Sequence, residues 1–473
     1  MPALTSPHLL SELTDTVALW RVEQRRQPAP DLAQRLAQLD AVARFVRDHQ
    51  DGLADAISQD YGHRSRHETL ITEVAPVLAS VRYAKKHLRA WMRPRRRHVD
   101  RMAYGLARNW VVPQPLGVVG VIVPWNFPLN LALVPLIFIL AAGNRAMIKC
   151  SENSRHFAAY MKAHLGGYLP PNVVHIEDET GGVGEVFSRV PFDHLLFTGS
   201  SKTGRAVMAA AAVNLCPVTL ELGGRSPAIV ADDFDLQVAA QRIAHVKYLN
   251  AGQICTTVDH VYVPRDKVPA FVEHVREIVA RRYSDIDSPD LSSIIDQRAY
   301  ARLRDTLEQL VGYAEITPLL PGSVFDDARH RIAPVVVVDP PADSILMQRE
   351  IFGPILPVVP YDTHDEVIAR INTGPHPLAI YPFSTDDGLI NLYVNEVMSG
   401  GVTVNDALLH VAQDDLPFGG VGESGMGHYH GREGFETFSK LRPVFRQARW
   451  STFGLMAPPY GRKLETLLKL LLR

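Results

Sequence analysis

A cysteine in the middle of the chain lies among residues that suit a reactive thiol. Cys255 follows Gly252 and precedes Thr256 and Thr257 in the stretch NAGQICTT. A structural cysteine normally has apolar neighbours, whereas a working thiol needs a polar setting and close approach of the backbone. An ordinary thiol pKa of about 8.5 leaves only a few per cent as thiolate at neutral pH, so a helix N-terminus, a cation or a bound cationic ring must lie nearby. A helix that begins at or just after Cys255 would supply part of this stabilisation.

Two other segments offer a base and an oxyanion donor. Glu221 ends an apolar strand in TLELGG, where Gly223 and Gly224 let the backbone pass close to whatever the acid faces. Apolar surroundings would raise its pKa from about 4.3 toward the range in which a general base activates water, with a structural ion pair as the equal alternative. Asn126 lies between two prolines in PWNFP, where its amide could donate to an oxyanion. The alternative is that Asn126 caps the helix that follows.

Two glycines lie where an apolar strand passes into a helix. In HLLFTGSSKTGRAVM the strand is expected to end at Thr198, and Gly199 and Gly204 bracket a turn before the helix. Such turns hold phosphate through backbone N–H groups and the helix dipole, although two glycines are also ordinary turn residues. Arg205 and Ala206 stand where a P-loop needs Lys and Ser or Thr, so a pyrophosphate without a metal ion is the favoured ligand.

A second strand end offers groups for a ribose. The stretch MIKCSE contains Lys149, which could donate to ribose hydroxyls, and Glu152, which could accept from them. The carboxylate of Glu152 would repel a 2′-phosphate, so these two residues favour NAD over NADP.

The elements that must position these residues follow two rhythms. Residues 6–86 repeat apolar side chains at spacings of three and four, which predicts several amphipathic helices. Beyond them, short Val- and Ile-rich runs alternate with helical stretches, which is the βαβ pattern of parallel sheets. The apolar run 116–144 contains Pro124, Pro128 and Pro135, so we expect a buried strand, a loop and a helix instead of a membrane span. The pattern predicts two α/β units, with the C-terminal part returning to close the assembly.

Composition argues against several other classes of protein. The 473 residues are 46% hydrophobic, which suffices for two or three globular domains. Lys plus Arg number 49 and Asp plus Glu 51, so no net field favours nucleic acid or an acidic surface. The three cysteines form no C-x-x-C pair, which argues against disulfides and zinc and fits a reducing cytoplasm. The first residues include acids and lack a basic start and apolar block, so we expect no signal peptide.

Seven segments occur together in an order that is typical of one enzyme family. They are PWNFPL, IKCSE, FTGSSKTG, LELGGRSP, NAGQIC, EIFGPILPV and PFGGVGESGMG. In order and spacing they resemble the NAD(P)-dependent aldehyde dehydrogenase superfamily, over almost the whole chain. The resemblance implies an α/β fold with a Rossmann-type cofactor domain, an α/β catalytic domain that carries the nucleophilic cysteine, and a small oligomerisation hairpin.

The resemblance also implies roles for single residues. Cys255 would be the nucleophile, Glu221 the general base, and Asn126 the oxyanion donor together with the Cys255 backbone N–H. NAD is the expected cofactor, NADP is less favoured, and no metal ion is implied. The implied cofactor-binding residues are Trp125, Lys149, Ser151, Glu152, Gly199, Ser200, Gly204, Leu222, Glu350 and Phe352.

These roles imply a covalent mechanism. The Cys255 thiolate would attack an aldehyde, a hydride would leave to NAD, and a water deprotonated by Glu221 would hydrolyse the thioester to a carboxylic acid. Relatives that pass the acyl group to coenzyme A typically lack an acid at this position, so Glu221 favours water as the acceptor.

The C-terminal segments bear on the substrate. HVAQDDLPFGGVG and GMGHYHGREGF look most like the bacterial coniferyl aldehyde enzymes, in a branch with the class 3 and fatty aldehyde dehydrogenases. This implies oxidation of coniferyl aldehyde to ferulate, with a fatty or general aldehyde as the alternative. A non-catalytic structural relative is the remote alternative.

Domain boundaries and partners follow from the same resemblance. We expect a homodimer formed through a hairpin within 98–117 and a strand around 443–451, a cytoplasmic location, and no nucleic-acid partner or transmembrane segment. The expected ranges are 1–94 and 113–220 for the NAD-binding domain with part of 404–440, 221–403 for the catalytic domain, 95–112 and 441–460 for the oligomerisation element, and 461–473 for a C-terminal tail.

Overall fold

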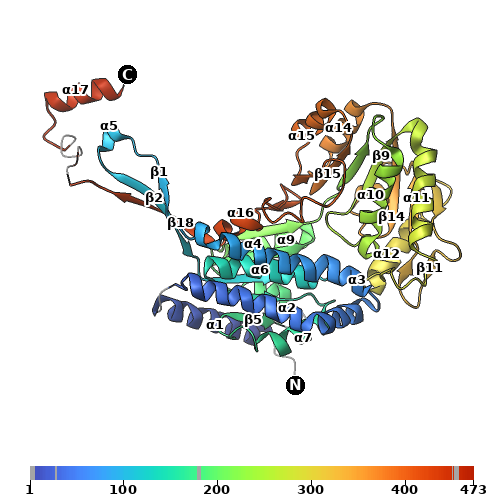
Figure 1. Ribbon diagram of the computed structural model, residues 1–473, viewed down its shortest axis with the longest axis horizontal. Coiled ribbons are helices and arrows are strands. Elements are labelled where there is room, and N and C mark those ends of the chain that lie inside the picture. The colour runs from blue at the N-terminus through green and yellow to red at the C-terminus, as the bar shows by residue number, and fades with distance from the viewer. Residues whose placement is uncertain (1–5, 27–28, 178–182, 450, 452–456, 473) are drawn as a thin grey trace.

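The computed structural model describes residues 6–26, 29–177, 183–449, 451 and 457–472. The remaining positions, which fall within the expected domain, hairpin and tail ranges, lie outside the described residues. Two large sheets form the body of the molecule, and a smaller sheet extends away from it (Figure 1). The predicted α/β class is confirmed.

The first large sheet has the strand order β17-β7-β6-β3-β4-β5, and only β17 runs antiparallel to its neighbour. All of its strands except β17 confirm the Val- and Ile-rich runs predicted before residue 223. They are β3 (Val118–Ile122), β4 (Arg145–Lys149), β5 (Val174–Glu177), β6 (His194–Gly199), β7 (Val218–Leu222) and β17 (Gly425–Met426).

Helices pack around this sheet, and those from the N-terminal segment confirm the predicted amphipathic helices (Figure 1). They are α1 (Ser6–Arg26), α2 (Leu32–Tyr61), α3 (Arg66–Thr69), the π-helical turn η1 (Leu70–Val74) and α4 (Ala75–Trp91). The remaining helices of this unit are α6 (Pro128–Ala142), α7 (Arg155–Leu165), α8 (Val183–Ser188), α9 (Ser201–Ala212) and α16 (Gly431–Thr437).

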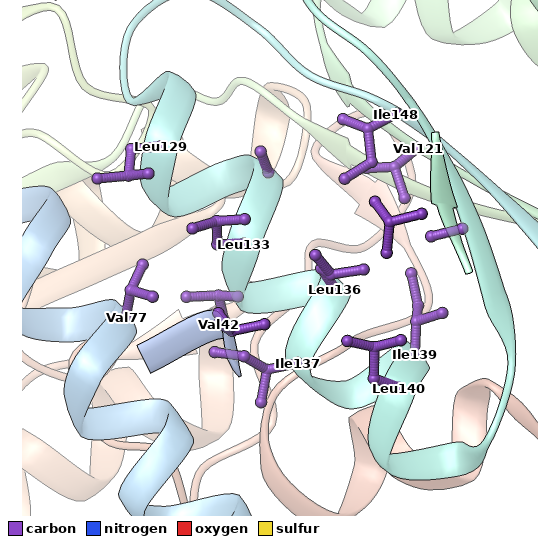
Figure 2. Packing of buried hydrophobic residues seen from close by; sticks show 14 of the residues in the cluster. Val42, Val77, Val121, Leu129, Leu133, Leu136, Ile137, Ile139, Leu140 and Ile148 are labelled. Carbon is purple, nitrogen blue, oxygen red and sulfur yellow. The ribbon is translucent and has the colours of Figure 1, made fainter. Parts of the chain in front are cut away.

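The apolar run 116–144 folds as strand, loop and helix, as predicted. Figure 2 shows why α6 is apolar around most of its circumference: Leu133 and Ile137 face the N-terminal helices, whereas Leu136 and Ile139 lie toward β3 and β4. The helix ends at Gly143, whose φ of 88° suits a residue without a Cβ. No helix among the described residues is both long and apolar enough to cross a membrane.

The second large sheet has the order β10-β13-β14-β9-β8-β15-β16, with only β10 antiparallel to its neighbour. Its strands are β8 (Pro227–Val230), β9 (His260–Pro264), β10 (Glu315–Pro318), β13 (Val335–Val338), β14 (Ile355–Tyr361), β15 (Ala379–Phe383) and β16 (Gly401–Val402). Around them lie α10 (Leu236–Tyr248), η2 (Leu249–Gly252), η3 (Arg265–Lys267), α11 (Val268–Arg282), α12 (Gln297–Glu308), the hairpin of β11 (Phe325–Asp326) and β12 (Arg331–Ile332), α13 (Ile345–Gln348), α14 (His364–Thr373) and α15 (Asp387–Glu396).

The third sheet joins distant parts of the chain. The long strand β2 (Arg108–Pro115) pairs antiparallel with β1 (Arg95–Arg97) and β18 (Ser439–Arg446), and α5 (Arg101–Tyr104) lies between β1 and β2. This sheet projects from the body, and α17 (Arg462–Leu471) lies beyond it at the C-terminal end (Figure 1). The expected role of this region in oligomerisation stays a prediction.

Candidate active site

A cavity of about 240 Å³ brings most of the predicted site residues together. It is lined by all three expected catalytic residues and by six of the ten expected cofactor residues, which come from both large sheets. The lining residues are Pro124, Trp125, Asn126, Leu131, Thr198, Gly199, Ser200, Glu221, Leu222, Gly223, Cys255, Glu350, Phe352, Leu378 and Phe418.

The backbone before Cys255 adopts an unusual conformation. Asn250, Ala251 and Gly252 have φ values of 51°, 50° and 73°, so three successive residues are left-handed. Only glycine adopts this region without strain, and a Cβ at Gly252 would also collide with the carbonyl oxygen of Gly353. Strain of about 1–3 kcal/mol per residue persists only where the surroundings hold it, and such residues cluster at functional sites.

No helix begins at or just after Cys255, so that conditional expectation was wrong. The thiol follows the end of η2, and β9 is the next regular element. Burial, followed by the negative charges of Glu350 and Glu221, raises the pKa of the Cys255 thiol to about 12. A positive charge beside the thiol would lower this pKa toward neutral pH.

Glu221 lies on β7 and is only 3% exposed. Neither carboxylate oxygen has a hydrogen-bond partner among the described residues, so the alternative interpretation, that Glu221 forms a structural ion pair, is wrong. Burial raises the pKa of Glu221 well above its ordinary value. A raised pKa makes the ionised carboxylate a stronger base toward water, and Glu221 lies in one cavity with the nucleophile.

Asn126 does not cap the following helix. The cap position of α6 is Phe127, and it makes no side-chain capping bond. The Glu73 carboxylate accepts from the N–H groups of Leu129 and Asn130 in the first turn instead, at 2.7 and 3.1 Å. The Asn126 amide donates to the carbonyl of Gln253 at 3.2 Å, which places it next to the nucleophile loop.

Glu350 and Phe352 lie opposite the Asn126 loop. The Glu350 carboxylate accepts from the Gly224 N–H at 3.3 Å, and burial together with Asp259 raises its pKa to about 8. The Phe352 ring meets the Trp125 ring edge to face, with centroids 5.4 Å apart. Two aromatic rings therefore bound one side of the cavity.

Four predicted cofactor residues lie outside the cavity lining. The Lys149 ammonium at the end of β4 contacts the Glu152 carboxylate at 2.5 Å, and the Ser151 hydroxyl accepts from the Asn153 N–H. Because β4 pairs in parallel with β3, Lys149 ends beside the strand that leads to the Asn126 loop. The pair therefore sits next to the cavity, not in it.

Gly204 lies inside α9, so it does not bracket the turn as expected. A Cβ there would come within 2.7 Å of the Leu222 side chain, so its lack of a side chain lets α9 pack on β7. Ser200 caps the helix, and its hydroxyl accepts from the Thr203 N–H at 3.3 Å. Strand β6 ends at Gly199, so Ser200 alone separates it from the N-terminus of α9, a helix of 12 residues.

Comparison with known proteins decides the family. The model of the Aldehyde dehydrogenase family matches residues 21–444. The chain belongs to this family. Its members oxidise aldehydes to carboxylic acids with NAD(P) as cofactor.

Relatives and solved structures agree with this assignment. The chain is 45% identical over 460 residues to a probable coniferyl aldehyde dehydrogenase of Pseudomonas aeruginosa, covering 97% of this chain and 96% of the relative. It is 41% identical over 452 residues to a coniferyl aldehyde dehydrogenase of Pseudomonas sp., covering 94% and 93%. A substrate-bound structure of Staphylococcus aureus AldH superimposes with a TM-score of 0.90 at 32% identity, covering 98% of this chain and 99% of that one.

The residues present in this aldehyde dehydrogenase fit a dinucleotide cofactor. The Thr198 hydroxyl is buried without a partner among the described residues, and it lines the cavity next to Gly199 and the cap of α9. A Cβ at Gly223 would collide with the Glu350 carboxylate, so the absence of a side chain at Gly223 leaves room for that carboxylate in the cavity wall. Unsatisfied polar groups beside a helix N-terminus are what a pyrophosphate needs.

Sequence reasoning missed part of the aldehyde dehydrogenase site. Phe418 and Leu378 line the cavity, and Phe418 lies in the motif PFGG that carried the resemblance, so it could have been named. The Asn126 carbonyl accepts from Tyr61 and Arg64, and the Glu73 carboxylate accepts from the N–H of Leu129 in the helix that follows. No sequence motif marks Tyr61, Arg64 or Glu73.

Proposed function

We propose that this aldehyde dehydrogenase oxidises coniferyl aldehyde to ferulate, with NAD as cofactor and water as acyl acceptor. The observation that carries the choice of water is the Glu221 carboxyl, buried and unpartnered among the described residues, in one cavity with Cys255. The substrate is supported by two relatives that are more than 40% identical and are named for coniferyl aldehyde.

The residues of the cavity divide the reaction between them. After the Cys255 thiol has lost its proton, the thiolate sulfur bonds to the aldehyde carbon, and the carbonyl oxygen becomes an oxyanion that the amide of Asn126 stabilises by donation. NAD, when bound, supplies the acceptor for the hydride that leaves this carbon. Glu221 then takes a proton from water, whose oxygen attacks the thioester carbon; the carbon–sulfur bond breaks and releases the acid and the Cys255 thiolate.

Cofactor selection rests on Lys149 and Glu152. The Lys149 ammonium is buried, whereas the Glu152 side chain is 51% exposed at the end of β4. A carboxylate at this strand end can accept from ribose hydroxyls and repels a 2′-phosphate. This supports NAD over NADP.

The cavity wall suits a flat, conjugated aldehyde. Trp125, Phe352 and Phe418 present aromatic rings to it, and Leu131 and Leu378 add apolar surface. Aromatic rings stack on planar ligands in offset or edge-to-face geometry, which gains more than area burial alone. A saturated aliphatic chain gains only the area term.

We also propose that the protein forms a homodimer and works in the cytoplasm. β18 is an edge strand of the projecting sheet and leaves one row of backbone groups for a second copy. We expect a homodimer in sizing chromatography, and a monomer would contradict it. All three cysteines are free, which supports a reducing cytoplasm.

The substrate assignment is tested by kcat/KM with NAD for coniferyl aldehyde, benzaldehyde, hexanal and a twelve-carbon aldehyde, followed by NADH formation. We expect coniferyl aldehyde to be preferred by about tenfold or more, equivalent to ~1.4 kcal/mol of differential transition-state binding. A preference for the aliphatic aldehydes would overturn the substrate and leave the mechanism in place.

A further inference from the structure

The backbone carbonyl of Asn126 is held by three side chains from outside its own loop. It accepts from the Tyr61 hydroxyl at 2.9 Å, from the Arg64 guanidinium at 3.1 Å and from the Asn250 amide at 3.4 Å. All these groups are buried. A carbonyl oxygen has two lone pairs, so three converging donors fix its position more tightly than an ordinary loop peptide needs.

A buried ion pair anchors one of these donors. The Arg64 guanidinium contacts the Glu73 carboxylate at 2.6 Å, and both side chains are 0% exposed. The second oxygen of Glu73 accepts from the N–H groups of Leu129 and Asn130, the first turn of α6. The Arg64–Glu73 pair therefore binds the backbone at two places: Arg64 donates to the Asn126 carbonyl, and Glu73 accepts from the first turn of α6.

The same buried groups reach the nucleophile loop. The Asn250 amide donates to the Tyr61 hydroxyl at 3.1 Å and to the Gln253 carbonyl at 3.2 Å, and the Asn250 N–H donates to the Glu68 carboxylate at 2.9 Å. Asn250 is the first of the three left-handed residues before the cysteine, so these bonds hold a strained conformation in place. The Asn126 amide donates to the same Gln253 carbonyl, which links the two loops directly.

We propose that Tyr61, Arg64, Glu68 and Glu73 are positioning residues for the oxidation of the aldehyde. We call these four the buried brace. They fix the Asn126 amide relative to Cys255, and the inference rests on the proposed role of Asn126 as oxyanion donor.

The geometry explains why such a brace matters. The Asn126 amide has two N–H groups, and one of them is engaged by the Gln253 carbonyl. With its peptide also fixed by Tyr61 and Arg64, the second N–H keeps one direction before the substrate arrives. Donors fixed in advance cost no reorganisation as charge develops, whereas a displacement on the order of 1 Å can cost about 100-fold in rate.

Tyr61→Phe tests the brace with the smallest change in shape. It removes one hydroxyl that does not line the cavity, and Tyr361→Phe is a matched control, because the buried Tyr361 hydroxyl also donates to a backbone carbonyl, that of Val230, at 2.9 Å. We expect Tyr61→Phe to lower kcat by about tenfold with little change in KM for NAD, and the control to stay within about twofold of the original chain. Equal kcat values for the two variants would overturn the proposal.

A double-mutant cycle separates positioning from folding. Asn126→Ala alone should lower kcat by about 100-fold, and adding Tyr61→Phe should then change kcat by less than about twofold, because the group that the brace positions is gone. If the two substitutions lower kcat independently, so that their fold-changes multiply in the double variant, the proposed positioning role is overturned. Full kcat in Asn126→Ala would overturn the proposed role of Asn126 as well, whereas a slow Asn126→Ala beside a normal Tyr61→Phe would overturn the brace alone.

A second variant guards against effects on folding. Arg64→Lys keeps the buried charge and loses the planar fork that contacts both Glu73 and the Asn126 carbonyl. We expect Arg64→Lys to lower kcat by about as much as Tyr61→Phe does, and to change kcat little when Asn126→Ala is already present. The thermal midpoint of unfolding is recorded for every variant. A fall in midpoint with unchanged kcat would show a purely structural role and overturn the proposal.

Discussion

Two buried glutamates near the active-site cavity are held in opposite ways. The Glu73 carboxylate contacts the Arg64 guanidinium at 2.6 Å and the N–H groups of Leu129 and Asn130 at 2.7 and 3.1 Å. Neither carboxylate oxygen of Glu221 has a hydrogen-bond partner among the described residues. The two side chains are chemically identical and equally inaccessible to bulk solvent, so their different behaviour comes entirely from the donors that the fold aims at them.

This contrast separates an acid that holds structure from one that is free for chemistry. Burial raises the pKa of Glu73, while Arg64 and two backbone N–H groups act to lower it. Burial raises the pKa of Glu221 well above its ordinary value, and no hydrogen bond among the described residues offsets this. Such a group lowers the stability of the fold at any pH above its unfolded pKa, because the unfolded chain ionises first. A chain tolerates this cost where a reaction needs the base.

Glu221→Gln should give the largest effect. Without a base to activate water, we expect steady-state kcat to fall by about 1000-fold. The first equivalent of NADH should still form, because Cys255 and Asn126 are intact and only hydrolysis of the thioester is blocked. Stopped-flow measurement of the burst and steady-state NADH formation check this, and Cys255→Ala is the control that should lose both phases. Normal turnover by Glu221→Gln would break the comparison.

Glu73→Gln should lower the stability of the fold in addition to its expected effect on kcat. It leaves the buried Arg64 charge without its partner, which typically costs about 3–5 kcal/mol of folding free energy. The control is Glu273→Gln, which breaks an exposed ion pair with Arg276 and should cost less than about 1 kcal/mol. Thermal midpoints of the two variants measure the difference. Equal midpoints would mean that Glu73 is no more structural than a surface acid.

Charges around the thiol should shift its reactivity by a smaller amount. The Glu350 carboxylate, followed by that of Glu221, raises the pKa of Cys255, so removing either negative charge lowers it. Without cofactor, Glu350→Gln and Glu221→Gln should therefore move the alkylation midpoint of Cys255 to lower pH, with Glu350→Gln having the larger effect. Peptide-resolved iodoacetamide labelling against pH measures this, with Glu273→Gln as the control. A midpoint that moves upward would contradict the assigned cause.

The residues that could be predicted are those that carry local motifs. Cys255, Glu221 and Asn126 stand in short glycine- and proline-rich segments, and the structure places all three in one cavity. Two local expectations failed, since no helix begins at Cys255 and Gly204 serves helix packing. In both cases tertiary packing decided what a short segment of sequence could not show.

The surroundings of these residues could not be predicted in the same way. Tyr61 lies 65 positions before Asn126 and 189 before Asn250, and it bonds to both. A polar residue near the end of an amphipathic helix is ordinarily a surface residue, so only the packed fold reveals that Arg64 and Glu73 form a buried pair. The contrast between Glu73 and Glu221 was invisible for the same reason.

A third acid extends the comparison to the surface and should show the smallest effect. The Glu152 side chain is half exposed and its carboxylate contacts the Lys149 ammonium, so it is held neither like Glu73 nor like Glu221. Glu152→Gln keeps its size and removes the charge that repels a 2′-phosphate. We expect kcat/KM with NADP to rise severalfold while kcat with NAD changes little. Initial rates with both cofactors check this, and Glu185→Gln, which affects an exposed pair with Arg189, is the control. A Glu152 carboxylate that contacts the ribose must also repel the 2′-phosphate of NADP. An unchanged ratio of NAD to NADP rates would therefore show that Glu152 does not select the cofactor.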